Sequence, residues 1–336
     1  MKATINDVAV QAGVSIKTVS RVINNEPSVR QVTRDKVQTA VNALNYQPNF
    51  AARNLAAAHS FSVAYIYDNP NAYYVIDTQE GILAACKQQG FELLIHPCKA
   101  SKENIFEEIS LMVEQSRIAG LILTPPFSEI PDFVQSILSL NVKVVRIMSG
   151  DEAPDKLTPC VMINDRAAAQ TITQHLIDQG HTKIGFLAGD SQHMSTVERY
   201  KGYKKALEIN GLEFDPQRVI EGSYAFEFGV AGTKELMARE EAPSAIFSCN
   251  DEIAAGSLYA ARLMNKKIPE ELAIVGFENS PFSRQTWPQM TTADQPNKEI
   301  AENAAKLLIS LIRQQESNHI VCQYVPQLVI RNSTAS

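Results

Sequence analysis

Apolar residues at the beginning of the chain recur at the spacing of a helix. Four of them mark one face: Ile5, Val8, Ala9 and Ala12. Thr4, with an acidic residue three positions later, is typical of a capping box, and Gly13 is suited to end the helix. Similar patterns predict helices over 16–24, with Ser15 as its cap, and over 33–44. Three short helices joined by tight turns are typical of a helix-turn-helix domain.

From residue 61 the pattern changes to apolar runs that alternate with amphipathic stretches. Strands are predicted at 61–67, 91–96, 120–124, 142–147, 161–164, 183–188, 245–248 and 272–277. Glycines close three of the intervening helices: Gly90, Gly180 and Gly211. This order predicts doubly wound parallel sheets with helices on both faces. The pattern restarts at residue 161, so we expect two such lobes, with ligands in the crevice at the carboxyl ends of their strands.

Composition adds a charge asymmetry to this picture. The 336 residues carry a formal net charge of −6, which by itself disfavours binding to a polyanion. Residues 1–60, however, hold seven Lys or Arg and three acidic residues, a net charge of +4, while the remaining 276 residues carry −10. A basic head on an acidic body indicates two functions in one chain.

Several classes of protein are disfavoured by absences in the sequence. No apolar run approaches the ~20 residues of a membrane span, and the N-terminus lacks a secretory signal, so we expect no membrane partner and a cytoplasmic protein. The five cysteines lie at wide, irregular spacings and form no C-x-x-C pair. The sequence shows no nucleotide loop, nucleophile elbow or metal-ligand spacing, so we expect no enzyme, no cofactor and no metal.

The polar face of the predicted second helix carries residues that suit DNA. Its members are Lys17, Thr18, Ser20, Arg21 and Asn24. Arg binds guanine bidentately, and Lys and hydroxyl groups reach phosphates or base edges. The alternative interpretation is an ordinary solvated helix face.

The segment that follows the third helix, 45–58, favours a short conditional helix. Pro48 ends the preceding helix and Asn49 is a suitable cap for a new one. The stretch 50–57 is too short to be stable alone, so it would form only when another surface supports it. Leu55 has few local apolar partners and could act as a wedge between DNA base steps. The alternative is a plain interdomain linker.

These residues resemble a known family. The segments ATINDVAVQAGVSIKTVSRVIN and NYQPNFAARNLA are similar to the DNA-binding head and hinge helix of the LacI/GalR family of bacterial transcriptional regulators. The resemblance implies that Ile16, Lys17 and Arg21 read bases, with Thr18, Ser20 and Asn24 near the DNA backbone. It also implies that Leu55 from two chains wedges into the centre of a palindromic operator. The full set of expected DNA contacts is Thr4, Ser15, Ile16, Lys17, Thr18, Ser20, Arg21, Asn24, Asn49, Ala52 and Leu55.

The body resembles the effector domain of the same regulators, which is similar to periplasmic sugar-binding proteins. The resemblance rests on the segments QGHTKIGFLAG, ERYKGYKKAL, PSAIFSCNDEIAAGSL, IPEELAIVGFENSP and MTTADQP. It implies that the chain crosses between the lobes three times. The expected organisation is a helix-turn-helix domain at 1–46, a hinge at 47–60, an effector-binding and dimerisation domain at 61–330, and a tail at 331–336. Within the body we expect an N-lobe of 61–160 plus 290–318 and a C-lobe of 161–289 plus 319–330.

Strand ends and family positions together nominate an effector site. The expected residues are Asp68, Tyr73, Thr124, Arg146, Ser195, Arg199, Tyr224, Asn250, Glu278 and Gln295. The resemblance implies that Arg199 binds sugar hydroxyls or an acidic group, and that Gln295, Ser195 and Tyr224 line the pocket. Most relatives carry Asp-Asp where this chain has Glu278-Asn279, which changes the reach of the carboxylate.

Arg146, Asp251 and Trp287 each leave two interpretations open. Arg146 with Arg199 could bind a phosphate or carboxylate bidentately, or Arg146 could pair with a structural acid. Asp251 could line the site or only cap its helix, and Trp287 could stack on a ligand or pack in the core.

The resulting hypothesis is a homodimeric repressor of carbohydrate-utilisation genes. A sugar or sugar phosphate would bind between the lobes and release the protein from double-stranded operator DNA. Three alternatives are kept: a regulator that acts with a corepressor, a sugar-binding protein of transport without a DNA role, and an α/β enzyme acting on a sugar.

Overall fold

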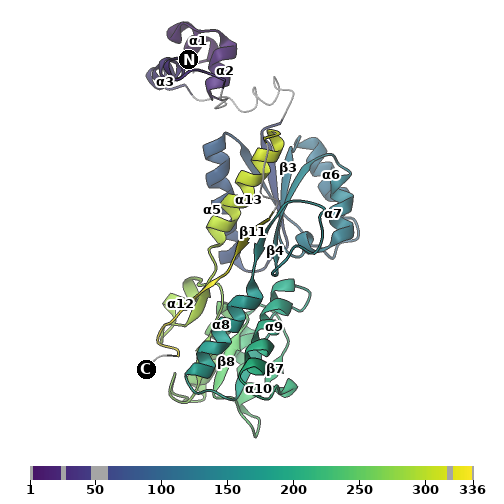
Figure 1. The fold of residues 1–336 in the computed structure, drawn as a ribbon, viewed down its shortest axis with the longest axis vertical. Coiled ribbons are helices and arrows are strands. Elements are labelled where there is room, and N and C mark those ends of the chain that lie inside the picture. The colour runs from purple at the N-terminus through teal and green to yellow at the C-terminus, as the bar shows by residue number, and fades with distance from the viewer. Residues whose placement is uncertain (1–2, 24–27, 47–59, 316–320, 335–336) are drawn as a thin grey trace.

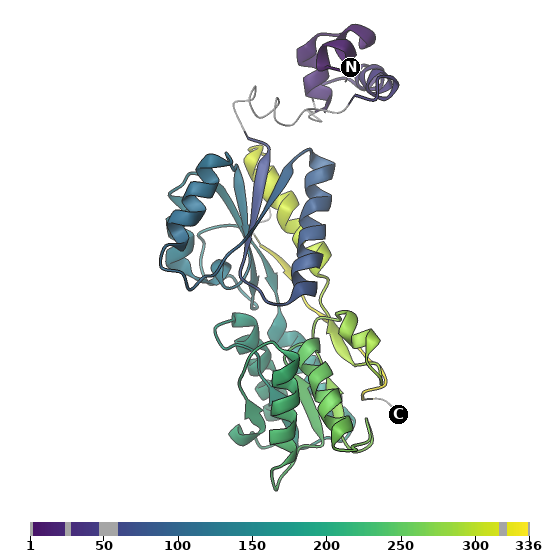
Figure 2. The same cartoon turned by 180° about the vertical axis from the view of Figure 1, so that it is seen from behind.

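The computed structural model of the chain describes residues 3–23, 28–46, 60–315 and 321–334. Three bodies are visible in Figures 1 and 2: a small helical head and two α/β lobes that lie end to end. The amino-terminal lobe, called the N-lobe, is built around β1 and the other lobe, called the C-lobe, around β8. The predicted fold class, a helical head followed by two lobes with parallel sheets, is confirmed.

The head consists of α1 (Ile5–Ala12), α2 (Ile16–Ile23) and α3 (Gln31–Ala43). The predicted capping box is present, since the Thr4 side chain accepts from Asp7 N while the Asp7 carboxylate accepts from Thr4 N. Gly13 ends α1 with φ +64°, a left-handed conformation that glycine adopts at little cost. The three helices enclose one small core of Val8, Ala9, Val19, Val22, Val37 and Ala40.

The N-lobe is a six-stranded parallel sheet in the order β11-β5-β4-β3-β1-β2. Its strands are β1 (Ser62–Tyr67), β2 (Glu92–Pro97), β3 (Gly120–Leu123), β4 (Lys143–Ser149), β5 (Cys160–Ile163) and β11 (Val321–Tyr324). Its helices are α5 (Ala72–Gln89), α6 (Ile105–Gln115), η1 (Phe127–Glu129), α7 (Pro131–Leu138) and α13 (Asn297–Ile312).

Helices cover both faces of this sheet because successive strand residues point to opposite sides. Val63 and Tyr65 pack with α5 and α13, whereas Ala64 and Ile66 pack with α6 and α7. The two helix pairs lie on opposite sides of the sheet in Figure 2. Gly81 allows α5 and α13 to approach closely, since a Cβ there would lie 2.1 Å from the carbonyl oxygen of Lys298.

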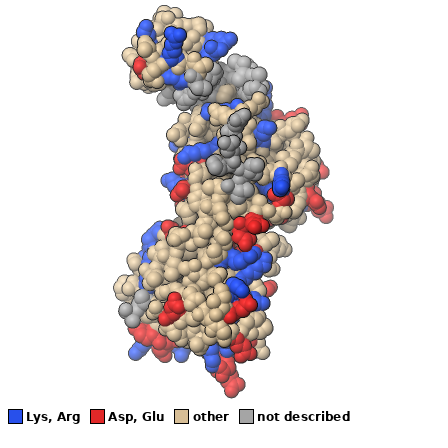
Figure 3. Space-filling model, in the orientation of Figure 1, with Lys and Arg blue, Asp and Glu red and all other residues tan. Residues whose placement is uncertain are grey.

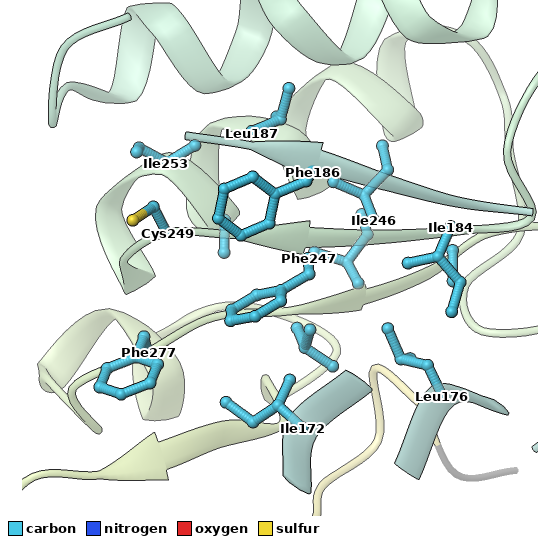
Figure 4. Packing of buried hydrophobic residues seen from close by; sticks show 14 of the residues in the cluster. Ile172, Leu176, Ile184, Phe186, Leu187, Ile246, Phe247, Cys249, Ile253 and Phe277 are labelled. Carbon is cyan, nitrogen blue, oxygen red and sulfur yellow. The ribbon is translucent and has the colours of Figure 1, made fainter. Parts of the chain in front are cut away.

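The C-lobe contains a second parallel sheet in the order β7-β6-β8-β9. Its strands are β6 (Ile184–Leu187), β7 (Val219–Ile220), β8 (Ala245–Ser248) and β9 (Ala273–Val275). Its helices are α8 (Asp165–Asp178), α9 (Met194–Ile209), η2 (Pro216–Arg218), α10 (Phe226–Met237), α11 (Asp251–Leu263) and α12 (Pro281–Gln285). Figure 4 shows the buried side chains between sheet and helices, with Phe186 and Phe247 edge-to-face at 5.1 Å.

Three strands, β5, β11 and β10 (Thr292–Asp294), belong to another lobe than the predicted bounds give them. The strand at 160–163 belongs to the N-lobe, since β5 pairs with β4, and β11 pairs with β5 in the same sheet. A small antiparallel sheet of β10 and β12 (Gln327–Val329) packs on the C-lobe core through Ala293 and Leu328. The chain therefore crosses between the lobes after β5, after β10 and after β11, three times as expected but at other positions.

The connection between β4 and β5 explains why the predicted lobe boundary falls before β5 rather than after it. The connection from β4 to β5 contains no helix, so the sequence pattern imitates the beginning of a new unit. The fully buried Arg146 guanidinium fixes this connection, donating to Asp155 at 2.5 and 3.0 Å and to Thr158 Oγ1 at 2.8 Å. Arg146 is therefore a structural partner of an acid, and the expectation that it binds effector is wrong.

The expected tail at 331–336 is partly integrated into the C-lobe. Ser333 is fully buried, accepts from Ile274 N at 3.1 Å through its carbonyl, and donates its own N–H to Gln289 O at 2.9 Å. Thr334 is also buried and bonds to the ring of His175 at 2.8 Å. The described residues after Ile330 thus close the exposed edge of β9.

Removing the partner of Arg146 should destabilise the protein. We expect Asp155→Ala to lower the free energy of unfolding by about 3 kcal/mol, because an unpaired buried guanidinium remains. Urea unfolding followed by circular dichroism measures the loss. Asp151→Ala is the matched control: this carboxylate is 50% exposed beside Arg166, and its removal should cost less than about 1 kcal/mol. Equal losses for the two variants would contradict the structural role of the Arg146 pair.

Candidate functional site

The outward face of α2 presents the residues predicted to read DNA. Ile16 is 50% exposed, and Lys17 and Arg21 are exposed, while Val19 and Val22 are buried on the other face. Thr18 and Ser20 are half-buried between these faces. The outward face of α2 therefore presents two cations and one apolar side chain, and an α-helix of this kind fits into the major groove of DNA.

Hydroxyl groups at the beginnings of α1 and α2 are committed to capping. Ser15 Oγ accepts from Thr18 N at 3.1 Å and contacts Thr18 Oγ1 at 2.9 Å. Thr4 is exposed, and its hydroxyl donates to Asp7 at 2.8 Å. In Figure 3, Lys and Arg outnumber acidic residues on the visible face of the head. Asn24, Asn49, Ala52 and Leu55 lie outside the described residues, so their predicted roles stay predictions.

A cavity of about 530 Å³, open solvent at its mouth included, lies between the lobes. The N-lobe strand ends and their loops supply one wall, and the beginnings of α8 and α9 with the loop after β9 supply the other. Its lining residues are Asn69, Asn71, Tyr74, Pro125, Ile147, Met148, Ser149, Ile163, Asp165, His193, Ser195, Arg199, Tyr224, Glu278 and Gln295. The cavity lies at the carboxyl ends of both sheets, where ligands of such folds bind.

Arg199 is the central cation of this cavity. It is 3% exposed, donates to Asp165 Oδ1 at 2.7 Å and to the Cys249 carbonyl at 2.5 Å, and its guanidinium carbon lies 3.7 Å from the centre of the Phe277 ring. Burial opposes the charge of Arg199, but Asp165 and other neighbours hold its pKa above the ordinary value. The guanidinium is thus always charged and held in one orientation.

Glu278 links the two lobes across the cavity. Its Oε2 accepts from Asn71 Nδ2 at 2.6 Å, and its Oε1 lies 3.9 Å from Arg199 Nη1. Burial raises the pKa of Glu278 to about 8, with Asp251 acting in the same direction and Arg199 against it. Its backbone has φ +103°, a conformation that L-residues rarely adopt and that is found at functional sites.

Aromatic and hydroxyl groups form the part of the cavity near the beginning of α9. Tyr224 OH contacts Ser195 Oγ at 3.3 Å and hydrogen-bonds to Thr196 Oγ1. The His193 ring packs edge-on against Tyr224 at 5.5 Å, and burial lowers the pKa of His193. A neutral imidazole and a phenol therefore supply polar atoms here without adding charge.

The structure brings together five of the ten residues predicted for the effector site. Ser195, Arg199, Tyr224, Glu278 and Gln295 line the cavity, and the Gln295 amide oxygen lies 3.4 Å from Arg199 Nη2.

The N-lobe residues predicted for the effector site lie beside the cavity, and neighbouring residues line it instead. Asp68 accepts from Lys99 Nζ and Ala100 N, both at 2.9 Å, while the next residue, Asn69, lines the cavity. Tyr73 packs edge-on with Phe282 at 5.6 Å, while Tyr74 turns inward, because neighbours on a helix face different directions. Thr124 is fully buried, and its hydroxyl donates to the Ile66 carbonyl at 3.4 Å.

Asn250 and Asp251 serve the fold rather than the cavity lining. Asn250 caps α11 by accepting from Ile253 N at 2.8 Å. Asp251 accepts from Ser280 N and Thr292 Oγ1, both at 2.6 Å, and burial raises its pKa to about 7. Trp287 is 75% exposed, so it neither packs in the core nor lines the cavity.

Sequence reasoning missed the residues that the tertiary structure brings in from crossover segments. Asp165 follows β5, the strand that was assigned to the wrong lobe, and bonds to both Arg199 and Ser149. Asn71 caps α5 and still reaches Glu278 with its amide nitrogen. A signal for both existed, since each is a polar residue directly after a buried strand or at a helix beginning, but many residues share that signal.

The arrangement suits the binding of a polar, largely uncharged molecule. Amide, hydroxyl and carboxylate groups converge on the cavity, and Pro125, Ile147, Met148 and Ile163 supply apolar surface. Within the described part of the chain, no group of His, Cys, Asp or Glu could hold a metal ion. None of the described helices is long and apolar enough to cross a membrane.

Comparisons with known proteins agree with this architecture. Residues 4–49 match the family "Bacterial regulatory proteins, lacI family", and residues 173–334 match "Periplasmic binding protein-like domain". The HTH-type transcriptional repressor PurR of Pasteurella multocida is 31% identical over 99% of both chains, and that of Haemophilus influenzae is 30% identical over 99% of both.

Solved structures show the same fold over the full length. A complex of the transcriptional regulator CelR with cellobiose has a TM-score of 0.75 and 26% identity, covering 98% of this chain and 99% of the other. A lac repressor dimer bound to operator and the anti-inducer ONPF also has a TM-score of 0.75, with 24% identity over 100% of both chains, and supports the fold alone. The chain therefore belongs to the lacI family of bacterial regulatory proteins, as a DNA-binding transcriptional repressor similar to PurR.

Proposed function

We propose that this repressor binds a neutral, polyhydroxylated effector, a sugar, in the cavity between its lobes. The observation that carries the proposal is the set of polar groups around Arg199: carboxylates of Asp165 and Glu278, and the amide of Gln295. Carboxylate and amide oxygens accept hydrogen bonds from hydroxyl groups, and a guanidinium donates to them. The resemblance of the body to the CelR–cellobiose complex supports the same class of ligand.

The charge of the cavity disfavours a sugar phosphate. Of the two arginines considered from sequence, Arg146 is fully buried and bound to Asp155, so only Arg199 remains in the described lining. Arg199 is already paired with Asp165, and Glu278 lies beside it. A phosphate would meet carboxylates without an unpaired cation, which is an unfavourable arrangement.

On the DNA side we propose that two chains form a homodimer in the bacterial cytoplasm and place two copies of α2 in the major grooves of a palindromic operator. Exposed Ile16, Lys17 and Arg21 support this role, as they lie on the face of α2 opposite its buried residues. Leu55 would supply the wedge at the operator centre. The effector is proposed to act as an inducer, and its binding and operator binding are reciprocally coupled, typically by ~1–3 kcal/mol.

Removing the basic side chains of α2 should weaken operator binding. We expect Arg21→Ala to cost about 1–3 kcal/mol and to relax base preference, and Lys17→Ala to act in the same direction. Fluorescence anisotropy with an operator selected by the wild-type protein from palindromic DNA measures both. Lys36→Ala, at an exposed position on α3, is the matched control. Unchanged affinity in the α2 variants, or an equal loss in the control, would refute the proposed DNA face.

The effector class is tested by a thermal-shift screen of the full chain. We expect a rise in Tm with neutral mono- or disaccharides and none with the corresponding sugar phosphates. A response to phosphates only, or to nucleobases only, would overturn the sugar proposal. The active sugar, added to the operator complex, should then weaken DNA binding; stronger binding would identify a corepressor. Ligand binding without any operator binding would favour the transport alternative, and conversion of the sugar would favour the enzyme alternative.

Glu278 provides the residue-level test of the cavity. We expect Glu278→Gln to weaken binding of the active sugar by about 10-fold to 100-fold, because an amide nitrogen replaces one acceptor oxygen of the side chain, and a buried polar group left without its partner costs ~1–3 kcal/mol. Isothermal titration measures the affinity. Glu240→Gln, an exposed position after α10, is the control and should bind like the wild type. If both variants retain wild-type affinity, the sugar binds elsewhere.

A further inference from the structure

Glu129 joins the two lobes outside the ring of residues that line the cavity. It belongs to η1 of the N-lobe, and its Oε2 accepts from Met194 N, the first residue of α9 in the C-lobe, at 3.1 Å. The contact spans 65 positions of sequence and depends on how the lobes sit against each other. Parting the lobes would break this hydrogen bond and expose the carboxylate to water.

The other carboxylate oxygen is less well satisfied. Glu129 Oε1 is buried, and no hydrogen bond of good geometry reaches it in the described part of the chain, although the backbone of Ser149 lies close enough to favour its charge. An ionised carboxylate offers about four acceptor sites, so a buried one with an unpartnered oxygen is costly. A neutral carboxyl group keeps the bond from Met194 N and avoids most of that cost.

The surroundings of Glu129 supply no free cation in the described structure. The groups that act on it electrostatically are Asp165 at the beginning of α8 and Tyr74 on α5. The neighbouring elements also carry Arg146 on β4, which donates to the Ser128 carbonyl, Asp132 on α7, His193 before α9, and Arg199 on α9, which is paired with Asp165. Arg146 is bound to Asp155, and burial lowers the pKa of His193, which keeps its ring neutral. Asp165 is a like charge and therefore opposes ionisation of Glu129.

Access to the cavity connects this contact to lobe movement. The groups deepest in the cavity are almost inaccessible, with Arg199 3% and Gln295 6% exposed, so parting of the lobes would open them to a ligand. Hinge closure around ligands is the usual motion of two-lobed binding proteins. Glu129 is half-buried with the lobes together, its Oε1 fully so, and parting of the lobes would expose both oxygens.

We propose that closure of the two lobes takes up a proton at Glu129, so that acidification favours the closed cleft. The proton comes from bulk water and forms one O–H bond on the carboxyl group, and nothing else in the chain is oxidised, reduced or transferred. An effector that requires the closed cleft would therefore bind more tightly at pH 6 than at pH 8. This proposal does not depend on the identity of the effector.

The direction of the pH effect follows from the two environments. Burial raises the pKa of Glu129 from its ordinary value of 4.5 to about 7 in the closed structure, although the backbone groups of Met194 and Ser149 lower it. A group whose pKa is higher in the closed state stabilises that state as the pH falls. Glu278 contributes a second proton for the same reason, since its pKa in the closed structure is about 8.

Lobe closure without ligand provides the test. Spin labels at Gln135→Cys on α7 and Lys234→Cys on α10, in a Cys322→Ser background, report the distance between lobes; the other four cysteines are buried. Labelled protein is mixed with an excess of unlabelled chain, so that most dimers carry labels on one protomer only and the measured distance lies within that protomer. Between pH 7 and pH 6 the closed-to-open ratio should rise steeply in the wild type, each proton contributing up to tenfold per pH unit.

Glu129→Gln should reduce this pH dependence by the contribution of one proton and should be more closed than the wild type at pH 8. Glu107→Gln, at an exposed position on α6, is the matched control and should follow the wild type. An unchanged slope in Glu129→Gln, opening of that variant at every pH, or a wild type that shows no pH dependence would each overturn the proposal. If Glu129→Gln does not fold, Glu278→Gln isolates the remaining proton: a pH-dependent ratio supports the assignment to Glu129, and a flat one refutes it.

Discussion

The buried guanidinium of Arg199 is the interaction on which the C-lobe wall of the cavity depends. It binds the carboxylate that follows β5 of the N-lobe and the carbonyl that follows β8 of the C-lobe, and it lies near the amide that follows β10. A charge removed from water is tolerable only when such partners surround it. The same partners are the groups that a ligand must satisfy, so the element that stabilises the cleft also defines its chemistry.

Around this cation, the region between the lobes holds more carboxyl groups than positive charges. Asp165 neutralises Arg199, while Glu278 and Glu129 are buried by the meeting of the lobes. This excess accounts for two proposed properties together: preference for a neutral ligand over an anionic one, and proton uptake when the cleft closes. Both follow from the cost of leaving like charges unpaired in a region that excludes water.

The described part of the head is stabilised by packing of neighbouring helices rather than by buried charged groups. Its core of six small side chains is formed by three local helices. Its net positive charge suits the proposed contact with DNA, while the excess of acid lies on the body, where it discourages non-specific contact with phosphates. Separate bodies allow these opposite electrostatic requirements to coexist in one protein.

Local patterns along the chain were enough to predict individual elements: the capping box at Thr4, the end of α1 at Gly13, and the strand β8 with its observed bounds. Periodicity and capping are properties of neighbouring residues, so the chain reveals them directly. Family resemblance also nominated Arg199, Glu278 and Gln295, which line the cavity between the lobes. Only the tertiary structure showed that β5 and β11 complete the N-lobe sheet, that Arg146 is structural, and that Asn71 and Asp165 reach the cavity. Those outcomes depend on which distant strands pair and which charges are buried together, and such long-range choices leave no periodic trace in the sequence.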